Sequence, residues 1–193
     1  MTSTLAAIAI PPSLRDSAPV HSKDRDREPR TAWYPGVGVA ILSRGDFWLA
    51  VRCRTYRADA PTGHFHDDDL SFELTAAGVD FVVDPGTGVY TADPVLRNVL
   101  RSRSSHSAIG LSRAETNRRA RDLFSMRIQS YPKRISLETD GFSASHHVGG
   151  VNYMRRFHLE SDRLVVEDRF DRPTPHVARV MFAPEVEVLQ GPD

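Results

Sequence analysis

Three absences narrow the function before any motif is considered: the sequence has one cysteine, no long apolar run and no excess of charge of either sign. Cys53 alone forms no intrachain disulfide and no cysteine-rich zinc finger, so a metal site would need histidine and carboxylate ligands. No run approaches the roughly 18–20 apolar residues that cross a bilayer. The 25 basic and 25 acidic residues argue against a nucleic-acid binder. We expect neither a membrane nor a nucleic acid as a partner.

The chain is long enough to bury one sizeable core, because 193 residues, 40% of them hydrophobic, are typical of a single domain. Residues 1–30 differ from the rest: they contain a proline pair and a dense run of charge, without a sustained hydrophobic period. We interpret them as a disordered or displaced leader and residues 31–193 as the domain. The run TLAAIAI is short, follows no basic residue and meets Pro11, so it does not predict a cleavable signal peptide.

Short β-rich runs separated by glycine, proline, aspartate or asparagine follow one another from Trp33 onward. About ten such runs predict an all-β fold, an antiparallel β-sandwich or barrel. The segments SRGD, AAG and ESD, which begin at residues 43, 76 and 160, predict hairpin turns between neighbouring antiparallel strands. Within the runs we expect Trp48 and Cys53 in the core. We interpret the polar, arginine-rich residues 112–123 as an exposed loop or a single turn.

Charge is divided along the chain in spite of the even balance. Residues 59–93 contain eight acidic residues and no lysine or arginine, whereas residues 97–134 contain ten basic and two acidic residues. The basic stretch predicts an anionic ligand, unless it is only the solvated face of an arginine-rich protein. Charge alone does not decide between the two.

Histidine and carboxylate side chains concentrate in residues 63–72, GHFHDDDLSF. If residues 64–68 are extended, the strand period of two puts His64, His66 and Asp68 on one face, with neighbours about 6–7 Å apart. A His-x-His pair on a strand commonly supplies two metal ligands, although the pattern also arises by chance. The acidic residues 67–69 do not predict calcium, because an alternating strand cannot direct all three at one ion.

Two more candidate ligands stand beside predicted strands. Asp84 ends the apolar run of residues 81–83, and His106 precedes another run. Asp84, which comes before Pro-Gly, is either a turn-capping residue or a ligand carried by the sheet. Two histidines and one aspartate would suit zinc with an open or water-filled position, with Asp68 as a hydrogen-bond acceptor for a neutral imidazole.

An ordered set of motifs carries a family resemblance. The set comprises HFHDDDLSFEL from residue 64, Gly78, DPGTGVY from residue 84, Arg97-Asn98, Arg101-Ser102 and His106-Ser107. Together they resemble the heparinase II/III-type polysaccharide lyases from roughly Trp33 to the end of the chain. Such proteins pair an N-terminal α/α toroid with a C-terminal, supersandwich-like β-sandwich. The resemblance implies that this chain carries the sandwich without the toroid and stops before its last strands.

The resemblance also implies roles for individual residues. His66, Asp84 and His106 match the positions of a zinc site inside the sandwich, and His64 matches a catalytic histidine that faces the substrate cleft. Arg97, Asn98 and Arg101 would border that cleft and bind substrate. This chain departs from the family pattern at Asp67 and at Ser107, where the family commonly has asparagine.

The activity that the resemblance implies is β-elimination at a uronic acid within an anionic polysaccharide. Arg97 or Arg101 would screen the C6 carboxylate, which makes the C5 proton more acidic, and neutral His64 would accept or deliver a proton. In relatives a tyrosine and another histidine come from the toroid, and neither Tyr90 nor Tyr153 is assigned that role. The resemblance suggests a bacterial periplasm or cell envelope as the location, which the sequence features themselves leave unknown.

Two other interpretations remain open. In the first, the chain is a non-catalytic carbohydrate-binding or structural β-sandwich that zinc only staples. In the second it is a cupin-like metal enzyme with His64, His66, Glu73 and His106 as ligands. The spacing disfavours the cupin, because Glu73 lies seven residues after His66 and the DPG and RNxxR elements would have no explanation.

Overall fold

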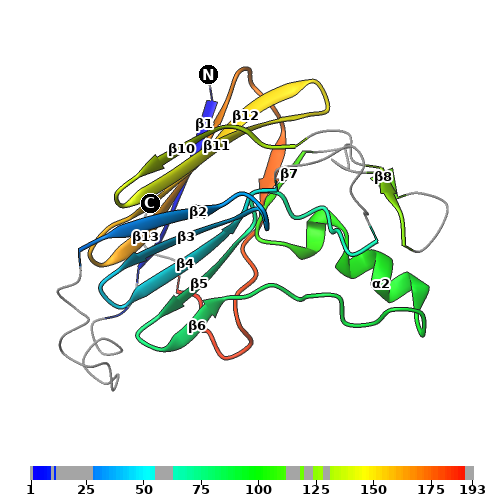
Figure 1. The fold of residues 1–193 in the computed structure, drawn as a ribbon, viewed down its shortest axis with the longest axis horizontal. Coiled ribbons are helices and arrows are strands. Elements are labelled where there is room, and N and C mark those ends of the chain that lie inside the picture. The colour runs from blue at the N-terminus through cyan, green and yellow to red at the C-terminus, as the bar shows by residue number, and fades with distance from the viewer. Residues whose placement is uncertain are drawn as a thin grey trace.

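The computed structural model describes residues 2–9, 11, 28–54, 63–111, 118–119, 124–127 and 131–189. In these residues two five-stranded antiparallel sheets face each other across a common hydrophobic core, as Figure 1 shows. The predicted all-β antiparallel sandwich is therefore confirmed.

The first sheet has the strand order β2-β3-β4-β5-β6. Its strands are β2 (Arg30–Tyr34), β3 (Val39–Arg44), β4 (Phe47–Arg52), β5 (Phe72–Ala76) and β6 (Val79–Val82). The hairpin turns predicted at SRGD and AAG join β3 to β4 and β5 to β6. In the second turn Ala77 and Gly78 have φ values of 52° and 76°, the pair of positive angles that a tight hairpin turn needs.

The second sheet has the order β1-β13-β12-β11-β10. Its strands are β1 (Thr2–Ala9), β10 (Lys133–Glu138), β11 (Gly141–Val148), β12 (Val151–Leu159) and β13 (Arg163–Phe170). The hairpin predicted at ESD joins β12 to β13. Two small sheets pair β7 (Ile109–Leu111) with β14 (His176–Ala178), and β8 (Arg118–Arg119) with β9 (Met126–Arg127).

The core forms because the strands alternate between buried and exposed side chains. On β4, Phe47, Leu49 and Val51 point inward and are at most 3% exposed. Trp48 lies between them on the opposite face and is 43% exposed, so the expectation that it belongs to the core is wrong. The period of two decides this position, since burying Trp48 would expose its three neighbours. Cys53 is buried, as expected.

Strand β1 corrects the prediction of a disordered or displaced leader for residues 2–9. All eight residues of Thr2–Ala9 pair with β13, and Ile8 packs against the core. The physical reason is that β13 has a long edge whose backbone groups a short run of alanine, threonine and isoleucine can pair. Residues 1, 10 and 12–27 of the predicted leader, and residues 112–117 and 120–123 of the predicted loop, lie outside the described residues, whereas residues 118–119 of that loop form the short strand β8.

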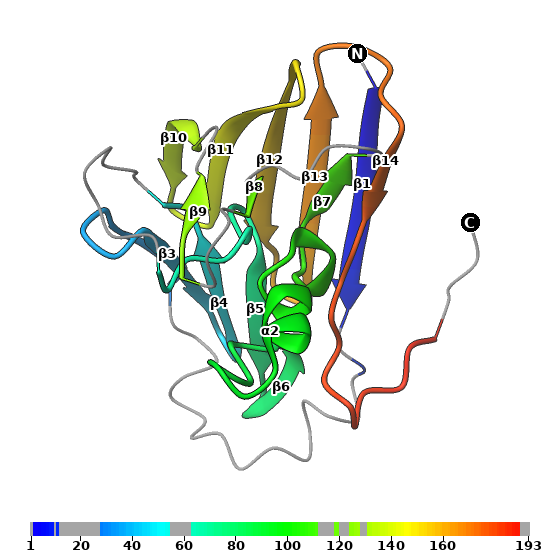
Figure 2. The ribbon, with the colours of Figure 1, turned by 90° about the vertical axis from the view of Figure 1, so that its right-hand side faces the viewer.

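Helices α2 (Pro94–Leu100) and η1 (Arg103–Ser105) were not expected from the sequence. Asp93 caps α2, since its carboxylate accepts hydrogen bonds from the N–H groups of Val95 and Leu96, and Pro94 fits the first turn. Figures 1 and 2 place α2 at one end of the sandwich. Neither of these short helices has the length and apolar character to cross a bilayer, and no other helix in the described residues does.

The buried thiol gives a test of the core. Burial, together with the nearby Asp69 carboxylate and against the smaller opposing effect of Arg52, raises the pKa of Cys53 to about 12. A protonated and inaccessible thiol is a poor nucleophile. The folded protein should therefore not react with a thiol-specific disulfide reagent at pH 8, and should react fully once denaturant is added. Rapid labelling of the folded protein would contradict this packing.

Candidate functional site

The segment from residue 63 to residue 71 is a loop of turns, not the extended strand that the His-x-His pattern suggested. Leu70 has a φ of 62°, which no strand residue adopts. As a result His64 and His66 do not face the same way. The ring of His64 contacts Tyr90, with centroids 6.0 Å apart, whereas the ring of His66 lies 5.4 Å from that of His106.

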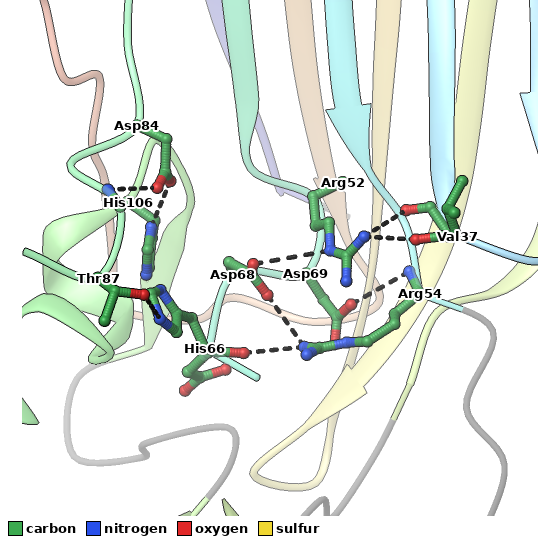
Figure 3. A network of polar contacts seen from close by, with 12 residues as sticks. Val37, Arg52, Arg54, His66, Asp68, Asp69, Asp84, Thr87 and His106 are labelled. Carbon is green, nitrogen blue, oxygen red and sulfur yellow. Dashed lines mark hydrogen bonds and ion pairs between the residues drawn. The ribbon is translucent and has the colours of Figure 1, made fainter. Parts of the chain in front are cut away.

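Three of the predicted residues converge. The ligand atoms of His66, Asp84 and His106 all lie within 4.8 Å of one another, although the residues come from three separate segments (Figure 3). His66 lies in the loop, Asp84 follows β6, and His106 follows η1. Both histidines are buried. Among the described residues no other group of three histidine, cysteine or acidic residues has this proximity.

Hydrogen bonds fix the state of this cluster. The Nδ1 atom of His106 lies 2.6 Å from Asp84 Oδ2, and Asp84 Oδ1 accepts the N–H of Gly86 at 2.9 Å. Burial tends to raise the pKa of Asp84, but the hydrogen bond and charge of His106 and the Gly86 N–H lower it overall. An ionised Asp84 can only accept, so His106 donates through Nδ1.

This tautomer leaves the other nitrogen of a neutral His106 as a bare acceptor. His106 Nε2 is buried and has no hydrogen-bond partner within the described part of the chain. A buried polar atom without a partner is unusual and needs an explanation. A metal ion is one, because metal-bound histidines commonly donate their second ring nitrogen to a carboxylate, as His106 does to Asp84.

His66 is also suited to a metal. Burial and the neighbouring His106 lower its pKa, against the opposing effect of Asp68 and Asp84, so the imidazole is neutral near pH 7. Its Nε2 lies 3.4 Å from the hydroxyl of Thr87, a long and weak contact. Two neutral imidazoles and one carboxylate make a donor set that zinc accepts, with room for one more ligand. The residues present therefore fit a zinc ion.

His64 stands apart from the cluster on the surface. Its side chain is exposed, and its ring meets Tyr90 edge to face at 72°. The preceding carbonyl, that of Gly63, accepts a hydrogen bond of 2.9 Å from Arg97. The Arg97 guanidinium lies 5.0 Å from the ring centroids of both Tyr90 and Phe124. Arg97 thus ties the His64 loop to α2.

The three residues predicted to bind substrate differ in their exposure to solvent. Arg97 and Arg101 are each only 1% exposed, whereas Asn98 is partly exposed. Arg101 donates to the Ser125 carbonyl at 3.3 Å, and its own carbonyl accepts the Asp67 N–H at 2.9 Å. Both arginines hold the loop in place through these hydrogen bonds. Substrate binding by Arg97, Asn98 and Arg101 stays a prediction.

Sequence reasoning missed the buried arginines that hold the loop. Arg54 donates to the His66 carbonyl at 2.9 Å and pairs with Asp68 and Asp69, as Figure 3 shows. Asp68 therefore serves Arg54 and Arg52, at 3.0 and 3.7 Å, and is not the hydrogen-bond acceptor for a ligand histidine that we expected. A second pair, Arg103 with Asp67, is equally buried.

A third buried pair joins Arg155 on β12 to Asp168 on β13 through two hydrogen bonds of 2.8 and 2.9 Å. Arg155 also donates to the carbonyls of Leu70 and Ser107. A signal for this pair exists in the sequence, because the period of two puts both charges on the inward face of apolar strands. No comparable signal marks Arg54 or Arg103.

Comparison with known proteins relates the whole fold to one family. The model of the family described as heparinase II/III-like, C-terminal matches residues 26–193. Among curated proteins, none matches this chain in sequence. Several solved structures share the fold, at identities too low to show more than that.

The similar structures include a crystal structure of heparinase III, with a TM-score of 0.51 and 13% identity over 70% of this chain and 21% of that one. Heparan sulfate lyase HepC from Pedobacter heparinus has a TM-score of 0.51 and 17% identity over 73% and 22%. A heparinase III gene product has a TM-score of 0.58 and 13% identity over 84% and 25%. This chain thus spans about a fifth to a quarter of the length of the structures it matches.

The hydrogen bond between Asp84 and His106 can be tested without metal. In metal-free protein, Asp84→Ala should lower the free energy of unfolding by about 1–3 kcal/mol, because a buried imidazole loses its partner. Asp80→Ala is the control: Asp80 is exposed and accepts a hydrogen bond from Thr75, so its loss should change stability by no more than about 0.5 kcal/mol.

The pH dependence of this effect has a definite sign. Because the pKa of Asp84 is lowered below 3.8, its contribution is present above that pH and disappears as the pH falls through the lowered value. The difference between Asp84→Ala and the parent, measured by denaturant unfolding, should thus shrink toward low pH. A difference that stays undiminished once the pH is well below 3.8 would contradict an ionised Asp84.

Proposed function

This chain belongs to the heparinase II/III-like, C-terminal family, and from that premise we propose that it is the sandwich part of a polysaccharide lyase. The proposed reaction is β-elimination on a uronic-acid-containing, anionic polysaccharide. The observation that carries the proposal is an exposed His64 on the same short loop as buried His66, which meets Asp84 and His106. A proton-transfer group is thus attached directly to a rigid, metal-suited centre.

His64 is the proposed catalytic residue. Elimination removes the C5 proton of the uronic acid, breaks the bond to the 4-linked oxygen and returns a proton to that oxygen. An exposed imidazole can accept or deliver such a proton near neutral pH. The edge contact with Tyr90 and the hold of Arg97 on Gly63 restrict where the ring can go. Restricted orientation of this kind is a large part of how a general base works.

His66, Asp84 and His106 would hold one zinc ion in this proposal. The ion would supply a fixed positive charge and a cross-link between the loop, the end of β6 and the segment after η1. Asp84 would keep His106 in the tautomer that leaves Nε2 available. In this proposal the three ligand residues hold the loop in place, and His64 on the same loop transfers the proton.

Arg97, Asn98 and Arg101 remain the proposed substrate-binding residues, with different roles. The partly exposed amide of Asn98 can contact a sugar directly. Arg97 and Arg101 are almost fully buried, so we propose that they act through their charge beneath the surface and by positioning the loop. The positive charge of the two arginines would then partly neutralise the negative charge of the C6 carboxylate.

The proposed reaction needs more than this chain provides. The described residues offer one exposed histidine at the site, whereas elimination requires a base, an acid and a charge neutraliser around one ring. We propose that an α/α toroid completes the cleft, in keeping with the short share of the similar structures that this chain spans. The burial of Arg97 and Arg101 favours a second candidate, a zinc-stapled sandwich that binds carbohydrate or supports structure without turnover.

The metal site gives the first test. Purified protein should bind about one zinc per chain, and His66→Ala and His106→Ala should each abolish that binding and lower thermal stability, because metal binding is coupled to folding. His64→Ala is the matched control, from the same loop, and should keep its zinc. Elemental analysis and a melting curve measure both effects. Zinc uptake that survives His66→Ala would remove this site.

Turnover separates the two candidate functions. The chain alone should release little or no unsaturated product from heparan sulfate, as measured by ultraviolet absorbance. Half a cleft cannot hold all the reacting groups around one sugar ring, and such positioning lowers the activation barrier by roughly 7–11 kcal/mol. Joined to an α/α toroid, it should turn over, and His64→Ala should lower the rate by about 10²-fold or more. His147→Ala, which removes an exposed histidine of β11, should leave the rate unchanged. Full activity of His64→Ala would contradict its role.

A further inference from the structure

We propose that Arg103 is a positioning residue that holds the two candidate histidine ligands at a fixed separation and thereby sets the affinity of the site for zinc. This inference rests on the metal site of the proposed function. It concerns a side chain that belongs to neither the predicted ligands nor the predicted substrate-binding residues.

Arg103 connects several segments through one guanidinium group. Its Nη1 lies 3.3 Å from Asp67 Oδ1, and its Nη2 donates to the Asp69 carbonyl at 3.1 Å and to the Tyr153 hydroxyl at 2.7 Å. Its Nε donates to the Ile109 carbonyl on β7. The residue is only 5% exposed. One side chain therefore joins the His66 loop, β7 and β12.

The position of Arg103 in the chain brings in the other histidine. Arg103 begins η1, and its carbonyl accepts the N–H of His106 at 3.3 Å. Its side chain meanwhile grips Asp67, the residue directly after His66. The backbone of Arg103 thus holds one candidate ligand and its side chain holds the neighbour of the other. A movement of Arg103 would change the distance between the two imidazoles.

Only an arginine can make this set of contacts. The planar guanidinium directs its N–H groups along fixed lines, which here end on a carboxylate, two carbonyls and a hydroxyl. A lysine would keep the charge but not the fork. Arg54, just after β4, donates to the His66 carbonyl, but within the described residues its hydrogen bonds and ion pairs reach only His66, Asp68 and Asp69. Arg155 also bridges the two segments, through the carbonyls of Leu70 and Ser107, but its contact on the loop is four residues after His66, whereas Arg103 contacts the adjacent Asp67.

The first measurement is zinc affinity of the full chain, by competition with a chromogenic chelator. Arg103→Lys should weaken zinc binding by about tenfold, the lower end of the range for losing a group bonded directly to a ligand, because Arg103 acts through the residue next to His66. Tyr153→Phe, which removes one of the acceptors, should weaken it less. Leu164→Val is the control, because it opens the core at β13 and should lower the melting temperature without changing zinc affinity.

A second measurement uses metal-free protein, so that its result does not depend on whether zinc binds. Hydrogen exchange should become at least about tenfold faster in Arg103→Lys at the amides of Asp67, Leu70 and Ser71, which are hydrogen-bonded in the parent. Exchange in the β3–β4 hairpin should stay the same. Leu164→Val should not show this local pattern.

The outcomes distinguish the inference from the function it rests on. If the parent does not bind zinc, the metal site of the proposed function is wrong, and faster exchange in the loop alone would still identify Arg103 as the residue that positions it. The inference is overturned if Arg103→Lys binds zinc within about twofold of the parent, or if loop exchange does not change. It is also overturned if Leu164→Val weakens zinc binding as much as Arg103→Lys.

Discussion

The buried ion pairs between arginine and aspartate are the interaction on which the rest of this site depends. Arg54, Arg103 and Arg155 are each no more than 5% exposed and each has an aspartate partner. A buried guanidinium must also find acceptors for its remaining N–H groups, and an unpaired buried charge costs about 3–5 kcal/mol. In this protein each of the three arginines finds one such acceptor among the carbonyl groups of the loop that carries His66.

The ion pairs explain why a turn-rich loop can carry a rigid site. The carbonyls of His66, Asp69 and Leu70 each accept a hydrogen bond from a buried arginine. Leu70 adopts a positive φ that costs a residue of this kind about 1–2 kcal/mol, and it keeps that conformation because its N–H and C=O are both bonded and its side chain is buried. The acidic residues 67–69 are occupied by these arginines. These acidic residues hold the loop that carries His66, and they are not ligands in the proposed metal site.

The sequence predicts those parts of the fold that depend on local pattern. Alternating runs and short turn segments indicate most strands and the three hairpins, because side-chain period and turn geometry are local properties. Strand β1 escapes prediction because its place depends on the free edge of β13, more than 150 residues away. The loop conformation escapes for the same reason: Arg155 reaches Leu70 across 85 residues of sequence. The meeting of His66, Asp84 and His106 is anticipated by family resemblance, whereas the burial of Arg97 and Arg101 is not.

The central claim is that this network brings two imidazoles and a carboxylate together around one metal ion. X-ray absorption spectroscopy at the zinc edge, on the zinc-loaded full chain, tests it most directly. The account predicts nitrogen and oxygen neighbours only, at about 2.0–2.2 Å, with the outer-shell scattering of two imidazole rings. A sulfur neighbour at about 2.3 Å, or a shell of oxygen atoms without imidazole scattering, would contradict it.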